Sequence, residues 1–94
     1  MVVKRIEIGI AGREIRTSSF DWVEQLARDL LLRGAVFSRP DGSVKVVAEG
    51  EETALRTFVE KLERGNIFGT VENFFVRWHE PSKKMGNFYV LVGA

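Results

Sequence analysis

Apolar and polar residues alternate along the first ten positions, where Ile6, Ile8 and Ile10 share one face and charged residues occupy the other. Successive side chains of a β-strand point to opposite faces, so this pattern predicts a half-buried strand from Val2 to Ile10. Similar patterns predict further strands at residues 35–38, 44–49, 70–80 and 88–92, of which the segment 70–80 is the longest.

Two other segments repeat apolar residues at the 3.6-residue period of a helix. Their apolar positions are Phe20, Val23, Leu26, Ala27 and Leu30 in the first segment, and Leu55, Phe58, Val59 and Leu62 in the second. Ser18, with Asp21 three residues later, is typical of a capping box at the start of the first helix, and Gly34 is expected as its C-cap. The second helix is expected over residues 51–64, with Gly65 as its stop.

The connections carry turn residues. Between the strands at 35–38 and 44–49, the motif Pro40-Asp41-Gly42 predicts a tight hairpin, because Asp-Gly supplies a positive φ at low cost. In the segment 70–80, the apolar residues share one face only if a bulge lies near Asn73.

The order of these elements is β-α-β-β-α-β with a short strand appended. It predicts an α+β sandwich of the ferredoxin-like class: a mostly antiparallel sheet, two helices on one face and an extra C-terminal strand. Ninety-four residues suffice for one domain, so we expect residues 1–94 to form a single unit. Many unrelated activities share this fold, and function has to be argued from a site.

Composition excludes several classes of site. The chain has no cysteine and a single histidine, His79, which argues against disulfides, thiolate metal centres and histidine-based triads, so no metal or cofactor is expected. The net charge is only +1, so no global field attracts nucleic acid or a membrane. No signal peptide or long apolar run is present, and we expect a monomeric cytoplasmic protein.

The stretch "GREIRTSSFDW", residues 12–22, is the first candidate site. Arg13 and Arg16 are followed by the hydroxyl residues 17–19 and by the expected start of a helix, a combination that suits an anion. The alternative interpretation is that both arginines are solvated loop charges.

The sequence as a whole resembles the acylphosphatase family. The strongest part is "LLLRGAVFSRPDGSVKVVAEGEETALRTFVEKLERGN", Leu30 to Asn66, in which the Asp-Gly-Ser-Val turn, Ala-Glu-Gly and the following helix keep the family's order and spacing. The later "VRWHEPSKKMGNFYV" is similar to the family's closing strand pair. The resemblance implies hydrolysis of carboxyl-phosphate bonds in small acyl phosphates, without a metal. It implies a glycine-rich cradle of backbone N–H groups for the phosphate, an arginine on the phosphate oxygens and an asparagine that orients the attacking water.

The resemblance departs from the family at these positions. A gapless count back from Asp41 places the asparagine on Ser38 and the arginine on Asp21, and the cradle reads Arg16-Thr17-Ser18-Ser19-Phe20, without its glycines. These departures predict a weakened or inactive acylphosphatase. Two alternatives stay open. One is an active enzyme that uses Arg13 or Arg16 as the phosphate-binding group, and the other is a non-catalytic module that binds a protein or an anion, supported if Phe37 and Phe75 both point outward.

Overall fold

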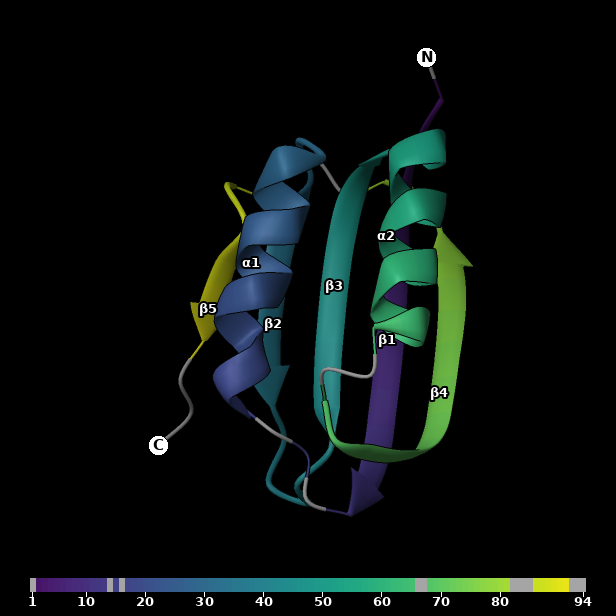
Figure 1. The fold of residues 1–94 in the computed structure, drawn as a ribbon. Coiled ribbons are helices and arrows are strands. Elements are labelled where there is room, and N and C mark those ends of the chain that lie inside the picture. The colour runs from purple at the N-terminus through teal and green to yellow at the C-terminus, as the bar shows by residue number, and fades with distance from the viewer. Residues whose placement is uncertain (1, 14, 16, 66–67, 82–85, 92–94) are drawn as a thin grey trace.

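A computed structural model of the chain describes residues 2–13, 15, 17–65, 68–81 and 86–91 (Figure 1). The elements, in chain order, are β1 (Val3–Arg13), the 3₁₀ turn η1 (Thr17–Ser19), α1 (Phe20–Asp29), β2 (Arg33–Ser38), β3 (Val44–Glu51), α2 (Glu52–Arg64), β4 (Thr70–His79) and β5 (Tyr89–Leu91). The predicted strands and helices are therefore present, with boundaries that differ by a few residues.

The five strands form one sheet in the order β4-β1-β3-β2-β5. Neighbours pair antiparallel except β2 and β5, which run parallel. Both helices lie on the same face, α1 over β2 and α2 over β1 and β3, and within the described residues the opposite face of the sheet carries no helix (Figure 1). This is the predicted ferredoxin-like α+β sandwich with its additional C-terminal strand.

The core lies between the helices and the sheet, and it is built from the predicted apolar stripes. Ile6, Ile8 and Ile10 of β1 are at most 1% exposed. Their partners from the other elements are Val44, Val46 and Ala48 of β3, Val23 and Ala27 of α1, and Leu55, Phe58 and Leu62 of α2. Full burial of one such large apolar side chain contributes about 1.5–3 kcal/mol, so this layer is the main source of stability.

The predicted bulge lies in β4, next to the expected position. Ala11 of β1 pairs with Asn73, whereas the next residue, Gly12, pairs with Val71, so Glu72 is the extra residue. The bulge shifts the alternation of β4 by one position. Val71 consequently shares the helix-covered face with Phe74 and Trp78, which pair with core-facing isoleucines of β1.

The predicted C-cap at Gly34 is wrong. The helix ends at Asp29, and the left-handed residue that follows it is Leu31, with a φ of 59°. The N–H of Leu32 donates to the carbonyl of Ala27, and the N–H of Leu31 donates to the carbonyl of Arg28. These two bonds define a Schellman motif with a leucine at the position that glycine usually occupies.

Gly34 lies instead within β2, where it is required by a close approach of two strands. Its φ is 140°, and a Cβ built on it would lie 1.9 Å from the carbonyl oxygen of Val47 in β3. The glycine is therefore needed for strand packing. The capping assignment failed because a helix cap and a close approach of two strands both favour glycine, so the sequence alone does not distinguish them.

The predicted capping box is also wrong. The residue before α1 is Ser19, which has helical angles (φ −74°, ψ −12°) and makes no side-chain cap hydrogen bond. The preceding 3₁₀ turn carries the right-handed backbone smoothly into the helix, so Ser18 does not occupy the extended conformation that an N-cap adopts. Elsewhere the turn chemistry is confirmed: Gly42 has a φ of 87°, and the Asp41 carboxylate accepts hydrogen bonds from the Ser43 amide and hydroxyl.

Candidate functional site

The predicted site lies at one end of the sheet. β1 ends at Arg13, α1 begins at Phe20, and β2 ends at Ser38, and all three ends meet at the same side of the molecule (Figure 1). This arrangement follows from the topology, because α1 and β2 are consecutive and run in opposite directions. Arg16 lies outside the described residues, as does the Thr17 side chain.

The backbone of the loop is right-handed where it is described. Residues 17–19 form a 3₁₀ turn, and among the described residues positive φ values occur only at Leu31, Gly34, Gly42 and Gly69. A nest of N–H groups around an anion requires right-handed and left-handed residues in alternation. The three hydroxyl residues do not provide that alternation, although a helical start still directs N–H groups toward this end.

The side chains of the predicted cradle divide between the core and the solvent. Phe20 is 5% exposed and Ser19 8% exposed, so both are part of the packed interior, and Phe20 anchors the first turn of α1 in the core. Ser18 is exposed, Asp21 is exposed in that first turn, and Arg13 is exposed at the end of β1. Charged side chains of both signs therefore lie at this end of the sheet.

Ser38 lies on the helix-covered face of the sheet. It pairs with Val44, which is 1% exposed and belongs to the core layer, and it is itself half-buried. A hydroxyl at this position faces the same layer of the molecule as the start of α1. The structure thus places Asp21 and Ser38 at the same end of the fold.

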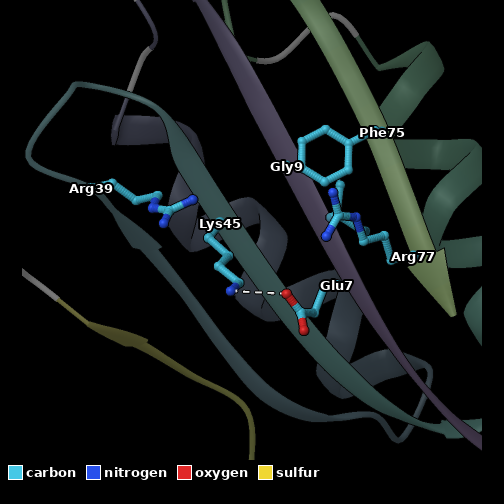
Figure 2. A pocket seen from close by; sticks show the side chains of 7 residues that line it. Glu7, Gly9, Arg39, Lys45, Phe75 and Arg77 are labelled. Carbon is cyan, nitrogen blue, oxygen red and sulfur yellow. Dashed lines mark ion pairs between the residues drawn. The ribbon is translucent and has the colours of Figure 1, made fainter. Parts of the chain in front are cut away.

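On the face without helices, the structure also brings together charged residues that the sequence analysis did not treat as a site. Arg39, Lys45 and Arg77 surround a hollow of about 240 Å³, with Glu7 at its rim and Gly9 and Phe75 at its floor and wall (Figure 2). These residues come from four separate elements of the chain. The alternation of β1 predicted that Glu7 faces away from the core, but no local pattern reveals which side chains lie beside it across the strands.

Glu7 is the electrostatic centre of this face. Its Oε2 atom lies 2.9 Å from Lys45 Nζ, and its Oε1 atom lies 3.1 Å from His79 Nε2. The distance between His79 Nε2 and Glu7 Oε1 is that of an ion pair, which requires a protonated imidazole. Among the described residues, His79 Nε2 makes no hydrogen bond. The hydrogen bond from Lys45 lowers the pKa of the Glu7 carboxyl. Partial burial raises this pKa, and the nearby positive charges lower it further, so that the net shift is downward.

A second carboxylate on this face is fully buried. Glu49 of β3 is 1% exposed and lies between Arg5 and Arg33 in the strand register, with Arg33 Nη2 3.3 Å from its Oε2. A buried charge is tolerated only when it is compensated, and the ion pair with Arg33 contributes to that compensation. We interpret Glu49 as a structural residue.

No group of three or more histidine, acidic or cysteine side chains that could hold a metal ion occurs in the described part of the chain. Within that same part, no helix is long and apolar enough to cross a membrane.

Comparison with known proteins gives consistent results. The family profile described as Acylphosphatase matches residues 6–90. An acylphosphatase of Lactobacillus gasseri is 31% identical over 91 residues, which are 95% of this chain and 99% of that protein. An acylphosphatase of Mycolicibacterium smegmatis is 37% identical over 67 residues, 71% of this chain and 68% of that protein. Among solved structures, the crystal structure of acylphosphatase from Bacillus subtilis is similar, with a TM-score of 0.81, 28% identity and coverage of 96% of this chain and 99% of that one.

Proposed function

The chain belongs to the acylphosphatase family, and from this premise we propose that it is a weakened or inactive acylphosphatase. The family reaction is the hydrolysis of a carboxyl-phosphate bond in a small acyl phosphate. The observation that carries the proposal is the right-handed 3₁₀ turn at Thr17–Ser19, at the place where the family's phosphate cradle is expected. Without a left-handed residue, these three N–H groups do not curl around a phosphate.

Asp21 strengthens the proposal through its charge. The position that the gapless count assigns to a phosphate-binding arginine holds an exposed carboxylate in the first turn of α1. At a separation of about 5 Å and an effective dielectric of about 20, the repulsion between two unit charges is roughly 3 kcal/mol. Loss of the arginine removes a further charge-assisted contact of about 1.5–3 kcal/mol.

Ser38 also supports weakened activity, because it stands where the resemblance implies the asparagine that orients the attacking water. Phosphoryl transfer depends on positioning, and the residue that orients the nucleophile has little chemistry of its own. A serine offers one hydroxyl, which rotates, whereas an asparagine offers a planar amide that donates and accepts at fixed angles. Ser38 can hold a water at this half-buried position, but it orients that water less firmly.

The test is the turnover of benzoyl phosphate by the wild-type protein and by the double variant Asp21→Arg/Ser38→Asn. We expect wild-type turnover close to the buffer blank. The double variant exchanges a repulsion for an attraction but keeps the right-handed turn. A gain of about 100-fold would assign the loss of activity to the two side chains, and no gain would assign it to the backbone of the loop. A matched control is Asp29→Arg, which makes the same charge change at the other end of α1 and should leave turnover unchanged.

The opposite result would favour the alternative of an active acylphosphatase that uses another arginine to bind the phosphate. Wild-type turnover well above the blank that disappears in Arg13→Ala or Arg16→Ala would identify a substitute phosphate-binding arginine and overturn the proposal. Arg13 is exposed at the correct end of β1 for this role. In that case Asp21→Arg should add little, since the cation is already supplied.

A non-catalytic binding module is the second candidate, and one observation favours it. Phe37 and Phe75 both lie on the open face of the sheet, as that hypothesis requires, and Phe75 is 44% exposed. They are not contiguous, because Gly9 and Lys45 separate them in the strand register. The face is therefore divided by a cation, which suits an anionic ligand better than a purely apolar protein surface.

A further inference from the structure

The open face of the sheet contains one row of residues that crosses all five strands. In the order of the strands it reads Phe75, Gly9, Lys45, Phe37, Leu91, each paired with the next. Because Gly9 has no side chain, the ring of Phe75 lies over it, and the surface stays low between that ring and Lys45. This part of the row lines the 240 Å³ hollow shown in Figure 2.

Positive charge is in excess at this hollow. Arg39 reaches toward it from the turn after β2, Arg77 from β4 and Lys45 from β3 (Figure 2). Against these three cations stands one lining carboxylate, Glu7, which leaves an excess of two. Glu7 is paired with Lys45 and approached by His79, and in the described part of the chain neither arginine makes an ion pair.

The neighbouring groups do not cancel that excess. Asp41, in the same turn as Arg39, accepts hydrogen bonds from Ser43, and these lower its pKa; the charge of Arg39 adds a smaller part. Its carboxylate does not line the hollow. The Arg77 guanidinium lies 5.3 Å from the centroid of the Phe75 ring, a cation–π contact that leaves its N–H donors available.

A second hollow adjoins the first. It has a volume of about 410 Å³, shares Glu7 and Lys45 with the first, is also lined by Arg5, and has Phe37, Tyr89 and Leu91 as its aromatic and large apolar lining. Tyr89 is 48% and Leu91 43% exposed. Exposed apolar side chains therefore lie beside the cationic hollow, on the β2 and β5 side of Lys45.

We propose that this face binds a phosphate monoester with a planar apolar body. The phosphate lies between the guanidinium groups of Arg39 and Arg77, and the body rests on Phe37 and Leu91. A phosphate monoester carries a charge of about −1.5 to −2 at neutral pH, which matches the excess of two cations, whereas a carboxylate carries only −1. Guanidinium groups also present paired donors that suit phosphate oxygens. The site lies on the face opposite Ser38 and does not rest on the proposed function.

The experiment is a titration of ¹⁵N-labelled protein with 1-naphthyl phosphate, followed through the backbone amides. We expect saturable shifts at Gly9, Phe37 and Lys45. The affinity for 1-naphthyl phosphate should exceed the affinities for inorganic phosphate and for 1-naphthol by about tenfold. Inorganic phosphate lacks the apolar body, and 1-naphthol lacks the phosphate. Arg77→Gln and Arg39→Gln should each weaken binding about fivefold to tenfold, with unchanged spectra elsewhere to show that the fold is intact.

Arg56→Gln is the matched control. Its guanidinium lies 5.0 Å from the ring centroid of Trp78, so it is likewise a cation over an aromatic ring of β4, but on the helix-covered side. We expect it to bind the probe like the wild type. Three results would overturn the proposal: equal weakening by Arg56→Gln, equal affinity for inorganic phosphate, or shifts confined to residues 17–21 and 38.

Discussion

The ring of Phe75 lies directly over Gly9, its partner across β4 and β1. A Cβ built on Gly9 would lie 2.2 Å from two carbons of that ring. Those atoms form the free end of a side chain that is 44% exposed, so the ring can move aside. The clash at Gly34 is of another kind, because there the Cβ would meet the backbone oxygen of Val47, which cannot move without breaking the strand pair.

This difference predicts opposite outcomes for two alanine substitutions. Gly34→Ala should lower the free energy of unfolding by more than about 3 kcal/mol, since it combines a backbone clash with a φ of 140°. Gly9→Ala should change it by less than about 1 kcal/mol, because moving the ring offsets the gain from removing a strand glycine. Urea unfolding of both variants measures this. Equal stability of the two would show that the close approach at Gly34 is not a real constraint.

The Schellman motif at the end of α1 predicts a stabilising substitution. Leu31 has a φ of 59° and is 86% exposed, so its side chain contributes little packing while its backbone is strained. A left-handed non-glycine residue costs about 1–2 kcal/mol, and glycine loses part of that gain through the entropy of the unfolded chain. We expect Leu31→Gly to raise the free energy of unfolding by about 0.5–1 kcal/mol.

The control for that substitution is Leu30→Gly. Leu30 has a φ of −91° and packs against the core, so glycine there relieves no strain and removes apolar contact. Its thermal midpoint should fall, while that of Leu31→Gly rises. A fall in both would mean that the left-handed position at Leu31 carries no strain.

The ion pair between Glu7 and Lys45 predicts a pH-dependent contribution to stability. The pKa of Glu7 is lowered from its ordinary value of 4.5, so its contribution is complete above that value and is lost as the pH falls through the lower, folded-state pKa. Glu7→Gln should therefore cost about 0.5–1 kcal/mol at pH 7 and nothing at the acid end of that window. Chemical unfolding at pH 7 and at several values below 4.5 gives the comparison.

Glu60 supplies the reference for this pH effect. Its pair with Arg64 lies on the surface of α2, with side chains 62% and 79% exposed. Glu60→Gln should change stability by only a few tenths of a kcal/mol at either pH. If Glu7→Gln shows the same flat profile, the lowered pKa of Glu7 does not contribute to folding.

The apolar pattern of the chain was enough to determine its elements and their order. Alternation at Ile6, Ile8 and Ile10 and the helical spacing of the two apolar stripes each require one buried face, and burial is the dominant favourable term in folding. The bulge beside Asn73 was predictable for the same reason, since only an extra residue keeps Val71 on the same face as Phe74 and Trp78. The acylphosphatase resemblance rested on equally local signals, such as the Asp41-Gly42 turn.

Tertiary structure decided what depends on residues far apart in the chain. Gly34 looked like a helix cap, but its role comes from the Val47 carbonyl that faces it in β3, and the left-handed cap fell to Leu31. Likewise, the hollow lined by Arg39 and Arg77 depends on the strand register, which places Gly9 between Phe75 and Lys45. Alternation tells which face a residue occupies. Only the pairing of strands tells which charges lie beside it, and the electrostatics of the open face therefore required the folded structure.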